Sequence, residues 1–325
     1  MPTIKDVALK AGVSVTTVSR VLNNRGYLSE ELKKKVLQAM DELNYRPNEL
    51  ARSLSRSRSN IIGLIIPSVA HPFFGELTGY IEEHAYRNGC KLLLCNSRQD
   101  KHKELEYIDM LRASRVDGII MGSHTLEVEA YQQMNLPLVT FDRQISPGIP
   151  YVCSDNYQGG VLATTLLIEK GCRQLAHIGG HPGLNILSGL RFEAFAATAG
   201  AHNIPYTLLH TDHNSFDVEA YERLLAQLIR EQPGTDGIFA GSDIIAAYAL
   251  KACREHGRRV PEDVRIVGYD GISLRSMLGP ALSTIRQPIE AMGKLAVELI
   301  IRQVHGGPVS PQYVLPVELE EGATT

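Results

Sequence analysis

The stretch Gly12-Val-Ser-Val-Thr-Thr-Val-Ser-Arg20 decides the fold of the N-terminal part of this chain. Before it, Thr3 and Asp6 have the spacing of a capping box, which predicts a helix with its apolar residues on one face. Gly12 suits the left-handed residue that ends such a helix, and Ser14 suits the N-cap of a second helix to about Leu22. Two short helices joined by a tight turn predict a helix-turn-helix motif.

The second helix of such a motif enters the major groove of DNA, where its N-terminal side chains reach the base edges. Val15, Thr16 and Arg20 face away from the apolar side and are therefore the predicted readers. Arg20 suits the acceptors of guanine, and the methyl groups of Val15 and Thr16 suit thymine methyls. A third helix from Ser29 to about Leu43 would complete the core, with the apolar side chains Leu32, Val36, Leu37, Met40 and Leu43. The alternative is a helical hairpin without a DNA-binding function.

Positive charge is concentrated in the same region. Residues 1–60 hold 11 Lys and Arg against 6 Asp and Glu, a net charge of +5, while the whole chain has −3, so residues 61–325 carry −8. A basic N-terminal part on an acidic body favours phosphate contacts at one end and an affinity that falls steeply with salt. Taken without its neighbours, a run such as Lys33-Lys34-Lys35 is more often a solvated helix face than a phosphate-binding one.

Residues 47–60 are rich in Ser and Arg and predict a hinge helix followed by a linker. Pro47 suits a first helical position, and Leu50, Ala51 and Leu54 share one helical face. Because two helical turns are marginal alone, this helix would order only when something covers its apolar face, such as a second copy, with Leu54 inserted into a base step of the minor groove. The alternative is a plain hydrophilic tether.

The module from Thr3 to Leu54 resembles the lactose- and galactose-repressor family of bacterial transcription regulators, and the resemblance extends over nearly the whole chain. It includes the segments His71-Pro-Phe-Phe-Gly-Glu-Leu77, Val116-Asp-Gly-Ile-Ile120, Ser154-Asp-Asn-Tyr-Gln-Gly-Gly160, Gly268-Tyr-Asp270 and Thr284-Ile-Arg-Gln-Pro288. The family implies a homodimer on near-palindromic operator DNA, a hinge helix ordered by DNA and a ligand that changes DNA affinity. The predicted DNA-binding residues are Thr3, Ser14, Val15, Thr16, Thr17, Ser19, Arg20, Asn23, Tyr45, Asn48, Ala51, Arg52 and Leu54.

After Asn60, apolar runs alternate with amphipathic stretches of helix length. The runs predicted as strands are 61–67, 91–97, 116–123, 136–142, 175–180, 207–212, 236–243 and 265–270. Short apolar strands separated by helices are typical of parallel sheets covered on both faces. About 265 residues suit two such cores better than one. The segment 116–123 recurs at 235–242 with five of eight positions identical, which also favours two α/β lobes.

We therefore predict an α/β protein with an N-terminal three-helix helix-turn-helix domain and a two-lobed, periplasmic-binding-protein-like body of parallel sheets. The DNA-binding domain takes residues 1–46, and the hinge helix and linker take 47–60. The ligand-binding and dimerisation domain takes 61–325, with lobe 1 over about 61–155 and 288–312 and lobe 2 over about 156–287 and 313–325.

A cleft between two such lobes lies at the carboxyl ends of their strands, where ligands bind. A sugar suits polar residues at these ends, because its hydroxyls pair with Asp, Asn and Arg while its apolar face lies on an aromatic ring. The candidate ligand-binding residues are Phe73, Phe74, Asp142, Asp155, Arg191, Ser242, Asp243, Asp270 and Gln287. The family resemblance implies ligand contacts for Phe74, Arg191, Ser242 and Asp270. For any single Asp, the alternative is a cap on the following helix.

Sequence motifs of the common enzyme classes are absent from the chain. Gly179-Gly-His-Pro-Gly183 follows a predicted strand but lacks the spacing of a dinucleotide loop. His210 and His213 with Asp212 could hold a metal, although so short a polar group more often stays solvated. The five cysteines lack zinc spacing and are expected to be reduced core residues. We expect no catalytic residue, no metal and no cofactor.

The N-terminus carries Lys5, Asp6 and Lys10 where a signal peptide has an apolar stretch, and no apolar segment is long enough to span a membrane. We therefore expect a cytoplasmic, ligand-responsive repressor of a carbohydrate operon with no membrane partner. Its expected partners are operator DNA, a sugar or sugar phosphate and a second copy of the chain, with a protein co-repressor as an alternative effector. The rival function is a sugar-binding or enzyme-like module with incidental DNA affinity.

Within the family, several segments are similar to the sucrose-operon branch, among them Leu93-Leu-Cys-Asn-Ser97 and Phe141-Asp-Arg143. The expected effector is therefore sucrose or a related sugar. An ordinary ribose regulator could share these segments. The tail after Leu315 has no leucine heptads that would build a four-helix bundle, so a tetramer is not expected.

Overall fold

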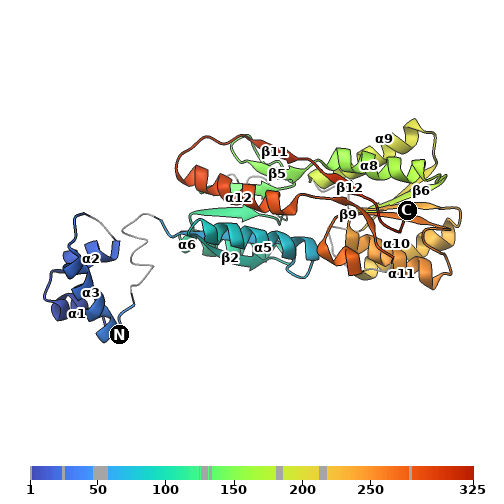
Figure 1. The fold of residues 1–325 in the computed structure, drawn as a ribbon. Coiled ribbons are helices and arrows are strands. Elements are labelled where there is room, and N and C mark those ends of the chain that lie inside the picture. Colours follow the sequence, from blue (N-terminus) through green and yellow to red (C-terminus); the bar gives the residue numbers. More distant parts are fainter. Residues whose placement is uncertain are drawn as a thin grey trace. The chain divides into compact units, whose positions relative to one another are not determined.

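The computed structural model describes residues 2–23, 26–46, 58–123, 125, 131, 134–180, 186–211, 218–277 and 280–325 (Figure 1). The chain divides into two compact units, Met1–Ser59 and Asn60–Thr325. Among the helices within these ranges, none is both long enough and apolar enough to cross a membrane. The predicted hinge contacts Asn48, Ala51, Arg52 and Leu54 lie outside the described residues.

The N-terminal unit contains α1 (Ile4–Ala11), α2 (Val15–Asn23) and α3 (Glu30–Glu42). The Asp6 carboxylate accepts hydrogen bonds from the backbone N–H of Thr3 at 2.7 Å and from its hydroxyl at 2.8 Å. Gly12 ends α1 in the left-handed region with φ 59°. The Ser14 hydroxyl then accepts from the backbone N–H of Thr17 at 3.0 Å and so caps α2. The predicted helix-turn-helix is confirmed, with the predicted capping residues.

One face of each helix forms the core of this unit. Val7, Val18 and Val36 are fully buried, and Met40 packs with them. Leu37, which we expected in this core, is 52% exposed, so that expectation is wrong. Successive residues of a helix are about 100° apart. The face that passes through Val36 and Met40 therefore leaves Leu37 on the solvent side.

Lobe 1 of the larger unit is a six-stranded parallel sheet in the order β11-β5-β4-β3-β1-β2. Its strands are β1 (Ile61–Ile66), β2 (Lys91–Asn96), β3 (Gly118–Met121), β4 (Leu138–Phe141), β5 (Tyr151–Ser154) and β11 (Gln312–Leu315). The helices α5 (Pro72–Arg87) and α12 (Ile289–Val304) pack on one face of the sheet. The helix α6 (Lys101–Ala113) packs on the other face.

Lobe 2 repeats this arrangement with the order β12-β10-β9-β8-β6-β7, in which only the β10–β12 pair is antiparallel. Its strands are β6 (Leu175–Gly179), β7 (Tyr206–His210), β8 (Gly237–Ala240), β9 (Arg265–Asp270), β10 (Ser283–Arg286) and β12 (Glu318–Glu320). The helices α8 (Asn156–Glu169) and α9 (Leu190–Ala201), which follows the short helix η1 (Leu187–Gly189), cover one face. The helices α10 (Val218–Glu231) and α11 (Asp243–Glu255) cover the other face.

The repeated Asp-Gly-Ile segment occupies the same place in both lobes. It begins β3 in lobe 1 and β8 in lobe 2, and each of these strands is fourth in the order of its sheet. Asp117 accepts a hydrogen bond from the backbone N–H of Asn60 at 2.9 Å. Asp236 accepts from the backbone N–H of Arg173 and of Gln174 at 2.9 Å. Each carboxylate therefore binds backbone just before the neighbouring strand, which explains why the segment recurs.

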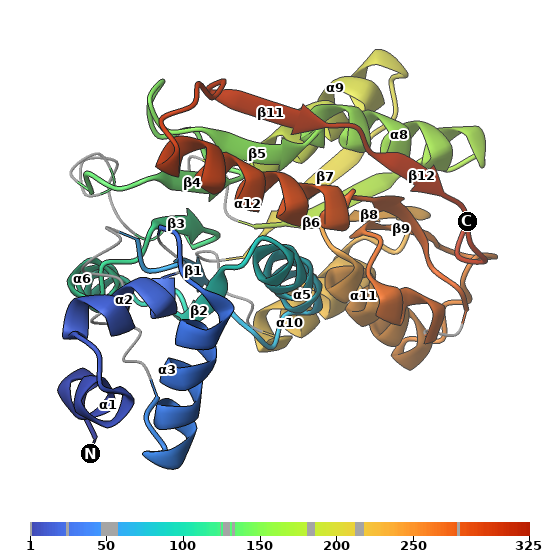
Figure 2. The same ribbon diagram turned by 60° about the vertical axis from the view of Figure 1, so that its left-hand side comes forward.

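The chain passes between the lobes after β5, after β10 and after β11, and Figure 2 shows β11 and β12 as successive red arrows in neighbouring lobes. We expected residues from 313 onward in lobe 2. Tyr313 instead pairs with Val152 of β5, so lobe 1 extends to Leu315. The expected boundary is therefore too early, because the short strand β11 completes the edge of the first sheet.

A close contact between α8 and α9 sets the positions of Asn156 and Arg191. A Cβ on Gly160 would lie 2.8 Å from the carbonyl oxygen of Arg191 and 2.7 Å from the Cβ of Ala194. Glycine is therefore required where the two helix backbones meet. This contact brings Asn156, at the start of α8, beside Arg191, at the start of α9.

Candidate functional site

A cavity of about 560 Å³ is lined by residues of both lobes. This volume suits a small-molecule ligand. Seven of the nine candidate ligand-binding residues line the cavity: Phe73, Phe74, Asp142, Arg191, Ser242, Asp270 and Gln287. The structure therefore brings together residues that are up to 214 positions apart in the chain, from Phe73 to Gln287.

Arg191 supplies a buried cation to the lobe 2 side of the cavity. Its Nε donates to Asn156 Oδ1 at 2.7 Å, and its Nη1 donates to the carbonyl oxygen of Gly241 at 2.8 Å. The guanidinium also lies over the ring of Tyr269, 3.5 Å from the ring centre. These contacts hold the planar guanidinium in one orientation and leave further N–H donors for a bound molecule.

Asp142 follows β4 in the left-handed region, with φ 52°. Its Oδ1 accepts a hydrogen bond from Asn156 Nδ2 at 3.0 Å. Burial raises the pKa of Asp142, while the charge of Arg191 and the hydrogen bond from Asn156 act in the opposite direction. Asn156 thus joins Asp142 to Arg191. Asn156 was missed in the sequence because Asp155, directly after the strand, is the more obvious polar residue.

Asp270 ends β9 and is 4% exposed. Gln287 donates from Nε2 to Asp270 Oδ1 at 2.8 Å. Burial raises the pKa of Asp270 well above its usual value, and the charge of Arg191 opposes this shift. Two buried carboxyl groups therefore depend on one guanidinium, and both offer oxygen atoms that accept hydrogen bonds from hydroxyls.

Aromatic rings form part of the lobe 1 side of the cavity. Phe73 and Phe74, in the first turn of α5, meet edge to face with ring centres 5.1 Å apart. His71 lies against Phe74 with ring centres 5.7 Å apart, and burial lowers the pKa of His71 to about 4. The cavity thus combines apolar ring surface with a guanidinium and carboxyl oxygens, a combination that suits a sugar.

His177 also lines the cavity, and the sequence analysis missed it because a histidine inside an apolar strand has no distinguishing pattern. Its Nδ1 donates to the carbonyl oxygen of Phe239 at 2.6 Å. Its ring stacks on the Phe239 ring with centres 4.5 Å apart. Burial lowers the pKa of His177 to about 3, so the imidazole is neutral and adds no charge beside Arg191.

Ser242 has two roles at the cavity. It lines the wall, and its hydroxyl accepts from the backbone N–H of Ile245 at 3.2 Å as the N-cap of α11. Asp155 is not among the residues that line the cavity, so its ligand contact stays a prediction. Its carboxylate caps α8 by accepting from the backbone N–H of Gln158 at 3.0 Å, so the helix-cap alternative holds for this residue.

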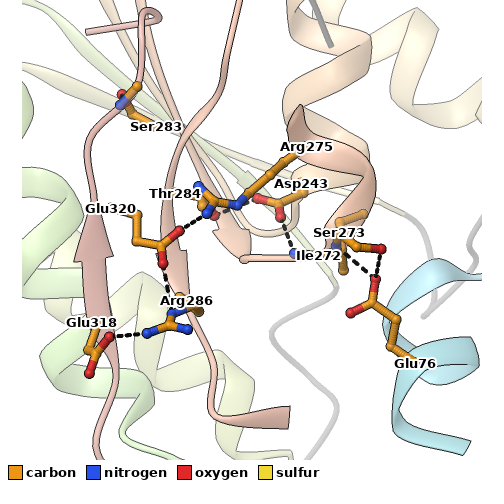
Figure 3. A network of polar contacts seen from close by, with 11 residues as sticks. Glu76, Asp243, Ile272, Ser273, Arg275, Ser283, Thr284, Arg286, Glu318 and Glu320 are labelled. Atoms are coloured by element: carbon orange, nitrogen blue, oxygen red, sulfur yellow. Dashed lines mark hydrogen bonds and ion pairs between the residues drawn. The ribbon is translucent and has the colours of Figure 1, made fainter. Parts of the chain in front are cut away.

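Asp243 is also not among the residues that line the cavity, and its predicted ligand contact likewise stays a prediction. Its carboxylate is fully buried and accepts from the backbone N–H of Ile272 at 2.9 Å and from the Thr284 hydroxyl at 2.5 Å (Figure 3). The carboxylate thus ties the start of α11 to β10 and to the segment that follows Asp270. This is a structural role behind the cavity.

The short helix η2 (Ser273–Met277) links this network to both lobes (Figure 3). Glu76 of α5 accepts hydrogen bonds from the backbone N–H of Ser273 at 2.8 Å and from its hydroxyl at 2.7 Å. Ile272 is 1% exposed and packs in the core cluster of lobe 1. Arg275 pairs with Glu320 of β12. The segment after Asp270 therefore contacts lobe 1 while it is anchored to lobe 2.

Replacing Asp243 by Asn is expected to change how stability depends on pH. Burial raises the pKa of Asp243 to about 6 from an ordinary 3.8. At a pH between these two values, Asp243 loses its proton in the unfolded chain but keeps it in the folded chain. The folded state of the wild type therefore loses stability as pH rises. We expect the unfolding free energy of wild type relative to Asp243→Asn to fall by about 1–3 kcal/mol between pH 4 and 7. Urea unfolding at pH 4.5 and 7.5 measures this difference, and an equal difference at both pH values would contradict it.

The exposed face of α2 carries the predicted DNA readers. Val15 is 40% exposed, and Thr16 and Arg20 are exposed one helical turn apart on the same side. Thr3, Ser14 and Thr17 take part in the helix caps described above, and Ser19 accepts a hydrogen bond from Asn23 at 3.4 Å. Tyr45 packs against the core of the unit. Val15, Thr16 and Arg20 therefore remain the side chains best placed to reach base edges.

Comparison with known proteins gives matches along the whole chain. Residues 3–48 match the model for bacterial regulatory proteins of the lacI family, and residues 164–325 match the model for a periplasmic binding protein-like domain. The ribose operon repressor of Halalkalibacterium halodurans is 41% identical over 326 residues, which cover 100% of this chain and 97% of that protein. The sucrose operon repressor of Pediococcus pentosaceus is 40% identical over 332 residues, which cover 99% of each chain.

Solved structures show the same architecture. The lac repressor dimer bound to operator and the anti-inducer ONPF has a TM-score of 0.88 and 27% identity, and the match covers 99% of this chain and 98% of that chain. A periplasmic binding protein/LacI transcriptional regulator from Alkaliphilus metalliredigens, complexed with D-xylulofuranose, has a TM-score of 0.73 and 34% identity. That match covers 82% of this chain and 99% of the other.

Proposed function

Because the chain belongs to the lacI family of bacterial regulatory proteins, and is a ligand-responsive DNA-binding transcription regulator, we propose that it represses a sugar operon under the control of a sugar bound in the cavity. The observation that carries this proposal is that Arg191, Asp142, Asp270 and the rings of Phe73 and Phe74 all line one cavity. This family consists of transcription regulators, so the enzyme-like alternative is set aside.

Ribose and sucrose are the first effectors to test. The relatives named above are a ribose operon repressor and a sucrose operon repressor at almost equal identity, 41% and 40%. A cavity of about 560 Å³ has room for either sugar. The similarity to the sucrose branch that we noted in the sequence therefore does not favour sucrose over ribose.

We further propose that two copies of the chain bind one operator. The readers on a single α2 cover one half-site, and a two-fold pair of such helices matches a near-palindromic sequence. The related lac repressor structure is a dimer on its operator, which supports this arrangement. A regulator that reads operator DNA acts where that DNA is, so we place the chain in the bacterial cytoplasm.

Fluorescence anisotropy with a labelled near-palindromic duplex, selected from a random pool by the protein itself, tests the proposal. We expect sequence-selective binding whose affinity changes about 5- to 150-fold when ribose or sucrose is added. Ribose 5-phosphate and sucrose 6-phosphate serve as the sugar phosphate arms. Binding without sequence preference would contradict the DNA-reading role, and a response only to a second protein would contradict the sugar effector.

A further inference from the structure

Glu104 of α6 is a fully buried acidic residue beside the lobe 1 wall of the cavity. Its Oε2 accepts hydrogen bonds from the hydroxyls of Ser123 at 2.6 Å and of Thr125 at 2.8 Å. Its Oε1 accepts from the hydroxyl of Tyr131 at 2.5 Å. Burying an acidic group costs free energy unless hydrogen bonds satisfy it. Because all three hydroxyls donate to Glu104, the direction of each hydrogen bond to this residue is fixed.

That direction can be followed from one hydroxyl to the next. A serine hydroxyl has a single hydrogen, and the hydrogen of Ser123 is used on Glu104. The Ser97 and Ser123 hydroxyl oxygens are 2.7 Å apart, so Ser97 is the donor in that pair and shares its hydrogen with the carbonyl oxygen of Ile66 at 3.2 Å. Ser97 in turn accepts from the backbone N–H of Gln99 at 3.3 Å. The hydrogen bonds therefore all run from Ser97 through Ser123 toward Glu104.

Ser123 and Thr125 also line the cavity. Ser123 is only 1% exposed, whereas Thr125 is partly exposed and within reach of a bound molecule. Because the Thr125 hydrogen points to Glu104, its oxygen presents only lone pairs to the cavity. An acceptor in this position favours a hydroxyl of the ligand and disfavours a phosphate or carboxylate oxygen, which has no hydrogen to donate.

We propose that Thr125 contacts the effector as a hydrogen-bond acceptor and that Glu104 is the positioning residue that makes it one. The proposal deepens the proposed function, on which it rests, because it states which group of the sugar lies against lobe 1: a hydroxyl that donates a hydrogen bond. Sugars without a free hydroxyl at that position are discriminated against, whatever contacts they make with Arg191 in lobe 2.

Thr125→Val and Thr125→Ser form the matched pair that tests the contact. Calorimetry on the full chain first identifies which of D-ribose and sucrose the wild type binds, which is the readout for the proposed function. Affinity for that sugar and for its mono-deoxy analogues is then compared between variants. We expect Thr125→Val to lower affinity for the sugar about tenfold and to abolish the preference over one deoxy analogue, while Thr125→Ser stays within about threefold of wild type.

Glu104→Met and Glu104→Gln test the positioning role. Glutamine can keep its carbonyl oxygen on Ser123 and Thr125 and turn its NH₂ toward Tyr131, so we expect Glu104→Gln to retain the preference. Methionine removes the acceptor and frees the Thr125 hydroxyl, so Glu104→Met should lose the preference. Tyr131→Phe, which removes the hydrogen bond to Glu104 Oε1 and leaves both partners of Oε2 in place, should lower the melting temperature without changing the preference for the sugar over its deoxy analogue.

The proposal would be overturned if Thr125→Val kept both the affinity and the preference of wild type. It would also be overturned if folded Glu104→Met still discriminated against the same deoxy analogue. Melting curves establish that each variant is folded. Thr125→Val removes only the Thr125 hydroxyl from the cluster, so this variant still tests the proposal if Glu104→Met does not fold.

Discussion

Replacing Arg191 by Ala is expected to weaken effector binding at least 100-fold and to leave a regulator that no longer responds to sugar. Arg191 is the buried cation whose charge opposes the raised pKa values of both Asp142 and Asp270. Without the guanidinium, the two buried carboxyl groups are poorly compensated when a sugar binds. The hydrogen bonds that the charged guanidinium donates to sugar hydroxyls are also lost. About 2.7 kcal/mol corresponds to a factor of 100. Calorimetry with ribose and sucrose measures the loss.

Two further variants make this expectation specific. Arg191→Lys keeps the charge but loses the planar guanidinium over Tyr269, so we expect an intermediate loss. Arg286→Ala removes an arginine of lobe 2 that pairs with Glu318 and Glu320 outside the cavity, and it should leave effector affinity within about threefold. Arg191→Ala with wild-type effector affinity would show that the ligand binds elsewhere.

Replacing Arg20 by Ala is expected to lower operator affinity by about 10- to 100-fold and to relax the choice of base at one position of each half-site. Arg20 is exposed on α2, one turn after Thr16. A bidentate contact to guanine accounts for about 1–3 kcal/mol of discrimination, which is the size of the loss expected here. Anisotropy against a set of single-base operator variants measures both the affinity and the lost preference.

Lys34→Ala is the matched control for Arg20→Ala. Lys34 is an exposed cation on α3, on a helix that carries none of the predicted readers. Its removal should weaken binding to all sequences about equally, through the salt-dependent phosphate contribution alone. If Arg20→Ala behaved in the same way, with an unchanged preference at every position, α2 would not read bases through this residue.

The fold class was accessible from the sequence because apolar runs mark eight of the twelve described strands. The structure confirms each of the eight predicted strands, with boundaries shifted by a few residues. The sequence analysis missed β5, β10, β11 and β12, which have only three or four residues each. The hydrogen-bond partners of β11 and β12 are far away in the chain, as in the pairing of Tyr313 with Val152, so local patterns do not reveal these two strands.

The site was predictable where a polar residue ends a strand and its hydroxyl or carboxylate stays available. Asp142 and Asp270 satisfy this rule, while Asp155 is used as a helix cap. Glu104 was missed because an acidic residue within an amphipathic helix usually lies in water. A signal was present, since Glu104, Ile108 and Leu111 share the buried face of α6 at positions i, i+4 and i+7.

The strands β11 and β12 have a consequence for how the protein is made. Each lies at the edge of its sheet, β11 against β5 and β12 against β10, and both are separated from their partners by long stretches of chain. During synthesis from the N-terminus, therefore, neither lobe is complete until residues 312–320 have left the ribosome. Until then, β5 and β10 keep open backbone edges that can pair with other chains. Chaperone dependence of the nascent protein should therefore persist until nearly the whole chain has emerged.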